Sequence, residues 1–122
     1  IVWHGRYASF FEDARDALGE RFGITYMDFY HHGILVPIRQ LHADFHRPLR
    51  LREEVTIEAS LHFSEAARIN HSFVIRGRAD EVATTGYSVQ MMLDTDHNLC
   101  MLPPPFYEAF LARWKQGRIF PA

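Results

Sequence analysis

The sequence is poor in cysteine and contains no long apolar run. Its 122 residues include one cysteine, Cys100, so no disulfide can form within the chain, which is typical of a reducing compartment. No apolar stretch approaches the roughly 18 residues of a membrane-spanning helix, and no signal-peptide pattern is present. We therefore expect a cytoplasmic protein that does not interact with membranes.

A strong charge of either sign is also lacking. The formal net charge is −2 at pH 7, so a strongly basic face for nucleic acid is not expected. Lysine is nearly absent, since 12 of the 13 cations are arginine. Arginine suits the binding of phosphate through its planar fork, although a genome rich in arginine codons would give the same composition. We predict that the protein does not bind nucleic acid.

Several motifs of catalysis and metal binding are missing. The sequence contains no glycine loop for phosphate and no Gly-x-Ser-x-Gly segment. His42 and His46 are four residues apart, which separates them by about 13 Å along a strand and argues against a metal pair. The segment 94–98 imitates a calcium loop but is followed by Leu99 and Pro105 where glycine and glutamate are required. We predict neither a metal nor a bound cofactor.

Hydrophobic periodicity predicts one long helix followed by strands. Apolar residues from Tyr7 to Phe22 recur every three or four positions, as in an amphipathic helix, and Gly23 stands where a helix is expected to end. A looser stretch, 24–33, follows. Apolar and polar residues then alternate in segments that predict strands, with the odd-numbered positions from Ala83 to Leu93 forming the apolar face of the last one. These segments are 34–45, 55–64, 68–76 and 83–93.

The order of these elements indicates the class of fold. A helix packed against an antiparallel sheet is an α+β arrangement. A shorter amphipathic helix is expected after the three prolines 103–105, with apolar positions up to Trp114. Because there are no repeats or linkers, residues 1–122 are expected to form a single domain.

The first fifteen residues carry a resemblance to a known family. Ile1-Val2-Trp3-His4-Gly5-Arg6-Tyr7, followed by Phe11-Glu12-Asp13-Ala14-Arg15, resembles the hotdog-fold acyl-CoA thioesterases of the 4-hydroxybenzoyl-CoA thioesterase type. The resemblance implies an antiparallel sheet wrapped around the long helix and pairing of chains into a homodimer or homotetramer. It also implies that a first strand and an Asp-x-Asp-x-x-Gly segment with the catalytic aspartate precede Ile1.

The same resemblance assigns the candidate catalytic residues. At the position of His4 the family uses a backbone N–H to bind the thioester oxygen, and the glycine that follows, Gly5, lets a substrate approach the start of the helix. Glu12 corresponds to an acidic position that reaches the active-site region, where it would orient the substrate or activate water. In the alternative interpretations His4 only caps the helix and Glu12 is an exposed acid that pairs with Arg15.

Three further residues are candidates for binding the substrate. Tyr7 would line an acyl or aryl pocket, although core packing is the commoner fate of such a residue. Arg47 and Arg50 would bind the phosphates of coenzyme A, or would simply be solvated.

The predicted activity is hydrolysis of an acyl-CoA or aroyl-CoA to the free acid and CoA. Two alternatives stay open. One is a thioesterase that acts on acyl groups carried by an acyl carrier protein, and the other is a non-catalytic module that binds acyl-CoA.

Overall fold

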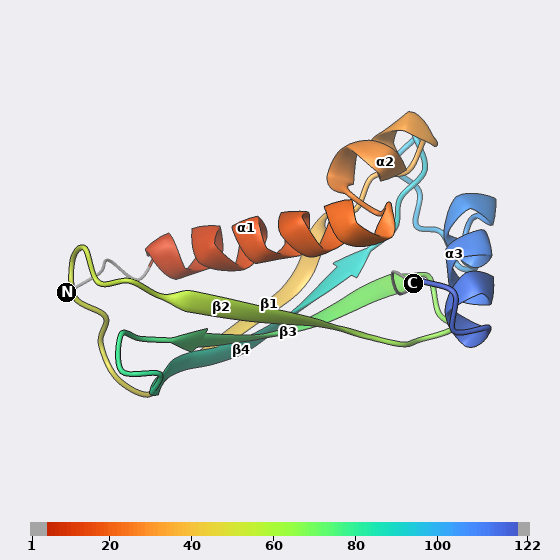
Figure 1. The fold of residues 1–122 in the computed structure, drawn as a ribbon. Coiled ribbons are helices and arrows are strands. Elements are labelled where there is room, and N and C mark those ends of the chain that lie inside the picture. Colours follow the sequence, from red (N-terminus) through yellow and green to blue (C-terminus); the bar gives the residue numbers. More distant parts are fainter. Residues whose placement is uncertain (1–4, 120–122) are drawn as a thin grey trace.

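The structure is a computed structural model, and it describes residues 5–119. It contains three helices and four strands in these residues (Figure 1). In chain order they are α1 (Gly5–Phe22), α2 (Tyr26–His31), β1 (Ile38–Phe45), β2 (Thr56–His62), β3 (Arg68–Arg76), β4 (Val82–Met91) and α3 (Pro105–Lys115).

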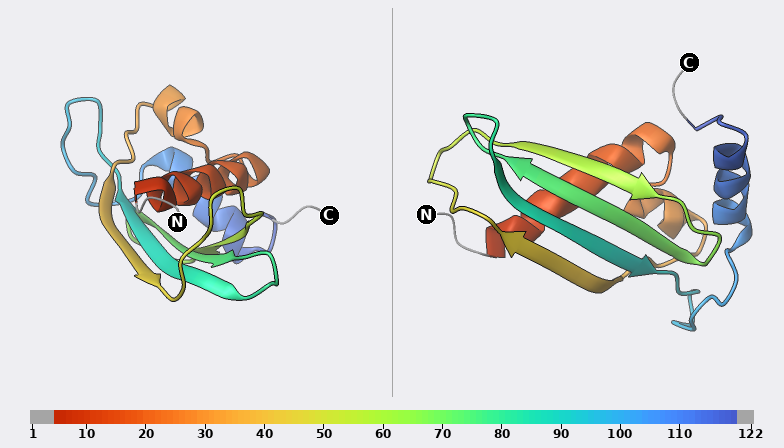
Figure 2. Two further views of the ribbon diagram at one scale, coloured as in Figure 1. Left: turned by 90° about the vertical axis from the view of Figure 1, so that its left-hand side faces the viewer. Right: turned by 90° about the horizontal axis from the view of Figure 1, so that it is seen from below.

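The four strands form one antiparallel sheet in the order β1-β4-β3-β2. The helix α1 lies along one face of this sheet, while α2 and α3 lie at the end opposite the β1–β2 loop (Figures 1 and 2). Two layers, one of helix and one of sheet, confirm the predicted α+β class.

The long helix was predicted correctly from its periodicity. It ends at Phe22, and Gly23 follows with φ +74°, a left-handed conformation that favours glycine. The amide of Ile24 donates to the carbonyl of Gly19 over 2.9 Å and closes the last turn. These contacts direct the chain from α1 into α2.

A glycine in β4 permits the close approach of α1 to the sheet. A Cβ atom on Gly86 would lie 2.8 Å from the ring of Phe11 and 2.5 Å from the carbonyl oxygen of His42. The ring of Phe11 instead stacks on Phe73, with centroids 4.5 Å apart. Gly86 therefore sets the spacing between the two layers.

The apolar core is divided into two clusters. One lies beneath the first half of α1 and consists of Tyr7, Phe11, Leu49, Phe73, Ile75 and Ala83. The other joins α2 and α3 to the far end of the sheet, and includes Phe29, Ile69, Met92, Tyr107 and Phe110. The buried His71 lies between the two clusters on β3, because Ile69 belongs to one and Phe73 to the other.

The strand β4 faces the opposite way from the prediction. In the register with β3, Gly86 pairs with Phe73 and Ser88 pairs with His71, so the even-numbered positions of β4 share the face covered by α1. Thr85, Tyr87 and Val89 lie on the other face, whereas Ala83, next to the register shift between Ile75 and Arg76, is buried in the cluster beneath α1 as predicted. The apolar pattern misled because the helix packs on small and polar residues here.

Two other elements differ from the prediction by more than two residues. Residues 26–31, which were expected to be irregular, form α2 because Thr25 and Asp28 cap each other: Thr25 Oγ1 accepts from the amide of Asp28 over 3.1 Å, and Asp28 Oδ2 accepts from the amide of Thr25 over 2.9 Å. The first strand begins at Ile38 rather than at residue 34. In 34–37 the chain meets β4 and its continuation through an isolated bridge between Leu35 and Leu93 and through the carbonyl of Pro37, which accepts from the amide of Met91 over 3.1 Å.

Within residues 5–119, no helix combines the length and apolar character that a membrane crossing requires.

Candidate active site

A cavity of about 530 Å³ opens between α1, α2 and the sheet. The residues that line it are of three kinds. Carboxylates come from α1, apolar side chains come from α2, the strands and the segments that connect them, and a few other polar side chains come from α1 and the sheet. The carboxylates are Glu12, Asp13 and Asp16, the apolar residues include Ile24, Phe29, Val36 and Ile69, and the polar group is Arg15, His71 and Gln90. The volume suits a small organic ligand.

Glu12 lies on α1 at the solvent side of this cavity. Its side chain is exposed and forms no ion pair with any residue of 5–119, Arg15 included. The carboxylate of Glu12 therefore does not form the ion pair with Arg15 that was considered as an alternative. Glu12 is one of the residues that line the cavity.

Arg15 reaches beneath the helix toward the sheet. Its Nη1 donates to Ser88 Oγ over 3.3 Å, and its guanidinium lies 5.8 Å from the centre of the Phe73 ring. Burial lowers the pKa of Arg15, and the charge of Glu12 partly offsets this effect. No carboxylate of the described residues is within ion-pair distance of its guanidinium.

His71 provides a buried imidazole on the wall formed by the sheet. The residue is 5% exposed, and its Nδ1 has no hydrogen-bond partner among the described residues. Burial, together with the smaller effect of the charges of Arg15 and His62, lowers the pKa of His71 to about 4. The ring is therefore neutral at pH 7 and offers one donor and one acceptor.

Of the two residues of the predicted oxyanion turn, the structure describes the backbone of one. Gly5 is the first residue of the helix, and His4 lies outside the described residues. Glu12 follows Gly5 by seven positions along the helix, a distance of about 10 Å along the axis. Because helix side chains point back toward the N-terminus, Glu12 covers part of that distance.

Tyr7 packs in the core. Its side chain is 5% exposed and its ring lies 4.8 Å from the ring of Phe45. It lines neither of the two cavities described here. Tyr7 is therefore a core residue, which was the alternative considered for it.

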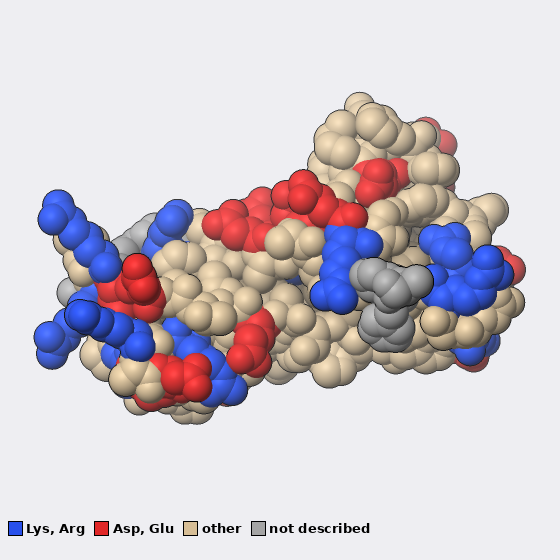
Figure 3. Space-filling view, viewed as in Figure 1, with Lys and Arg blue, Asp and Glu red and all other residues tan. Residues whose placement is uncertain are grey.

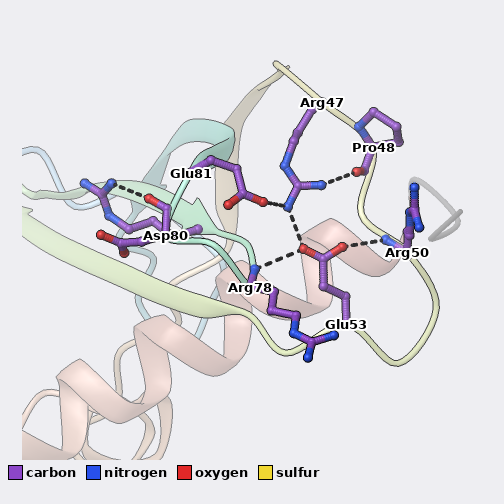
Figure 4. A network of polar contacts seen from close by, with 8 residues as sticks. Arg47, Pro48, Arg50, Glu53, Arg78, Asp80 and Glu81 are labelled. Carbon is purple, nitrogen blue, oxygen red and sulfur yellow. Dashed lines mark hydrogen bonds and ion pairs between the residues drawn. The ribbon is translucent and has the colours of Figure 1, made fainter.

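The two predicted phosphate-binding arginines lie in the β1–β2 loop. Arg47 donates from Nη1 to the carbonyl of Pro48 over 2.8 Å and from Nη2 to both Glu53 and Glu81 (Figure 4). These bonds join the loop to the β3–β4 turn. Two carboxylates offset the charge of Arg47, so it is held as a structural ion pair.

The same network leaves Arg50 free to act on a ligand. Glu53 accepts hydrogen bonds from the side chain of Arg47 and from the amides of Arg50 and Arg78, which together lower the pKa of Glu53 to about 2. The guanidinium of Arg50 is exposed and has no partner in residues 5–119. Arginine side chains project at this end of the molecule (Figure 3), around a second cavity of about 840 Å³ between the loop and the turn.

Comparison with known proteins places this geometry in a family. Residues 1–113 match the thioesterase-like superfamily. The chain belongs to this superfamily.

Three proteins show how similar this thioesterase-like chain is to known proteins. A Synechocystis protein, sll0410, whose name describes it as a candidate esterase, is 25% identical over 114 residues, which are 91% of this chain and 69% of the relative. The structure of a DHNA-CoA thioesterase from Staphylococcus aureus is 25% identical with a TM-score of 0.80, covering 98% of this chain and 85% of the other. A structure of the protein SAV2348 from the same organism in complex with CoA is 11% identical with a TM-score of 0.78, covering 99% and 75%.

These findings confirm the predicted family and the hotdog fold, in which the sheet wraps around the long helix α1. They also agree with thioester hydrolysis as the activity of this thioesterase-like chain.

Two polar cavity residues, Arg15 and His71, were not predicted to belong to the site. A signal existed for the second of them, since His71 interrupts the apolar side of β3 between Ile69 and Phe73.

Proposed function

We propose that this protein hydrolyses the thioester bond of an acyl-CoA or aroyl-CoA, with the acyl group in the cavity beneath α1. The observation that carries the proposal is an unpaired carboxylate, Glu12, at a cavity of ligand size in a thioesterase-like fold. A carboxylate with no internal counter-ion is available to orient or deprotonate water. Water then adds to the thioester carbon, the carbon–sulfur bond breaks, and the sulfur leaves as CoA after it takes up the proton.

The proposed electrophilic half of the site is the start of α1. Backbone N–H groups at the first turn of a helix have no partners within the helix, and the helix dipole is positive there. Gly5 begins the helix, and the backbone N–H of His4 is assigned to the thioester oxygen by resemblance. Glu12 would act together with the catalytic aspartate that the family has in the segment corresponding to residues before Ile1.

For the CoA phosphates we propose Arg50 as the direct contact, with Arg47 holding the shape of the loop. Arg50 is exposed and unpaired, whereas the guanidinium of Arg47 is occupied by Glu53 and Glu81. Charged phosphate oxygens accept strong bidentate bonds from a free guanidinium. Loss of the Arg50 charge should raise KM for an acyl-CoA and leave kcat nearly unchanged.

We also propose that the protein forms a homodimer, or a tetramer of two dimers, and that it acts in the cytoplasm. The strand β1 pairs on one side with β4, and its other edge has no partner strand in residues 5–119. Ile38, Leu41 and Phe45 on this strand are 40%, 46% and 54% exposed. An open edge with exposed apolar side chains favours pairing with a second copy. The single cysteine supports a reducing compartment.

The test is a substrate panel with the protein that includes the residues preceding Ile1. Short, long and aromatic acyl-CoAs should be hydrolysed, as followed by release of the free thiol. Absence of turnover across the whole panel, together with measurable affinity for acyl-CoA, would favour the non-catalytic module instead.

The remaining alternative function is hydrolysis of acyl groups carried by an acyl carrier protein. Turnover of one acyl group on CoA and on an acyl carrier protein, compared over a range of salt concentrations, distinguishes this alternative from the proposed function. Carrier proteins are acidic, so a preference for them that weakens with salt would favour this alternative.

A further inference from the structure

The apolar side of β3 is interrupted where it meets the cavity. Ile69, Phe73 and Ile75 on this face are at most 2% exposed and pack in the two apolar clusters, whereas His71 stands between them. A buried polar atom without a partner is costly, and His71 Nδ1 has none in the described residues. The neighbouring side chains on this face are apolar, so core packing alone does not account for an imidazole here.

Next to this imidazole lies a cation, Arg15, that forms no ion pair with any residue of 5–119, although the charge of Glu12 on the same helix acts on it. Arg15 is half-buried, and its one hydrogen bond in the described residues goes to the neutral hydroxyl of Ser88. Three carboxylates of the same helix line the cavity, yet none of them forms an ion pair with Arg15. A charge held away from water is stabilised by an ion of opposite sign, and here the cavity is the space where such an ion fits.

We infer that the preferred acyl group carries a carboxylate at its far end, and that Arg15 and His71 bind this carboxylate on the sheet side of the cavity. The inference rests on the proposed thioesterase function, of which it specifies the substrate class. One carboxylate oxygen accepts from the guanidinium of Arg15 and the other from the N–H of the neutral His71 ring. Ile24, Phe29 and Val36 provide apolar walls for the methylene groups or ring between the two ends of the acyl group.

The carboxylates around the cavity do not oppose this arrangement. Glu12, Asp13 and Asp16 are exposed on α1, where water and salt screen their charges. Acidic side chains line the upper surface of the molecule over this helix (Figure 3).

The experiment compares three CoA thioesters of the same chain length. Hexanoyl-CoA ends in a methyl group, 6-hydroxyhexanoyl-CoA in a hydroxyl and adipoyl-CoA in a carboxylate. For the wild-type protein we expect kcat/KM for adipoyl-CoA to exceed that for hexanoyl-CoA by about tenfold or more, since one charge-assisted hydrogen bond contributes that much. Equal values, or a preference for the hydroxyl or methyl end, would overturn the inference without any variant being needed.

Two variants test whether Arg15 and His71 cause the preference for the carboxylate-ended substrate. Arg15→Gln should reduce the adipoyl to hexanoyl ratio to near one, and His71→Leu should reduce it severalfold. Arg21→Gln removes an exposed arginine from the same helix that does not line the cavity, so it should keep the wild-type ratio. An Arg15→Gln protein that is folded and retains the preference would contradict the assignment.

Binding of non-hydrolysable thioether analogues separates this inference from the proposed function. Calorimetry with adipoyl and hexanoyl thioethers of CoA should show tighter binding of the adipoyl analogue that depends on Arg15. If the wild-type protein shows this preference but hydrolyses no acyl-CoA, the proposed function fails and the binding inference stands. If it hydrolyses acyl-CoAs but neither turnover nor binding distinguishes the carboxylate, the inference fails and the function stands.

Discussion

The buried imidazole of His71 makes stability depend on pH in a predictable direction. Its pKa is about 4 in the folded protein, against about 6.5 for an exposed histidine. Between these values the unfolded chain binds a proton that the folded protein does not, so protonation favours unfolding. The stabilisation is complete above pH 6.5 and is lost progressively as the pH falls toward 4.

The size of this effect follows from the two pKa values. The contribution of His71 to the free energy of unfolding falls by about 2 kcal/mol between pH 7 and pH 5, and by about 3 kcal/mol between pH 7 and pH 4. Other groups titrate in the same range, so the prediction concerns the difference between the wild-type protein and His71→Leu. The variant has no imidazole to protonate, and at pH 7 it should be about as stable as the wild type, because an unpartnered buried polar atom is removed.

The assay is guanidinium unfolding of both proteins at fixed protein concentration from pH 4 to pH 8, followed by circular dichroism. The two curves of unfolding free energy against pH should diverge below pH 6.5, with the wild type losing about 3 kcal/mol more by pH 4. His31→Gln serves as a matched control, since His31 is exposed at the end of α2 and its loss should not change the curve. Parallel curves for the wild type and His71→Leu would refute the reasoning that this ring is buried and neutral.

Three further predictions concern the packing, the loop and the open edge. Gly86→Ala should reduce the free energy of unfolding by about 1–3 kcal/mol, measured by urea denaturation, because the new methyl group would meet the ring of Phe11. Glu53→Gln weakens the acceptor that binds Arg47, so limited proteolysis should cut the β1–β2 loop faster than in the wild type, while unchanged cleavage would contradict the structural role of the network. Leu41→Lys places a charge on the free edge of β1 and should shift the mass measured by light scattering toward the monomer; a mass that stays dimeric would place the interface elsewhere.

Much of the fold was predictable because local pattern and final environment agree. The strand 68–76 was predicted with the bounds that β3 has, since its alternating apolar residues face α1. The helix up to Phe22 was predicted for the same reason. The helix α2 was missed because six residues are too few to show a helical pattern of apolar positions, although Thr25 and Asp28 indicated its start.

The orientation of β4 could not be obtained from its own sequence. Apolar residues at its odd-numbered positions indicated the packed face, but the close approach of α1 requires small residues such as Gly86. Which face the helix covers depends on pairing with β3, whose register brings Gly86 opposite Phe73. Long-range packing decides this, and a single strand does not encode it.

The candidate site was predicted in part for a similar reason. Glu12 was chosen by resemblance, and it lies at the cavity. Arg15 and His71 come from α1 and β3, which are far apart in sequence, and only the packing of helix on sheet brings them to one cavity. Tyr7 shows the opposite case, since an aromatic residue near a predicted site is a core residue here.

The central claim is that a thioester is hydrolysed at the Glu12 carboxylate. Its most direct test is kcat/KM for an acyl-CoA, measured by thiol release, in the protein with its full N-terminus and in Glu12→Gln. We expect the substitution to lower kcat/KM by about 100-fold or more, as for loss of a general base, while Glu20→Gln, an exposed acid of α1 that does not line the cavity, keeps the wild-type value. A folded Glu12→Gln protein with wild-type turnover would contradict the account.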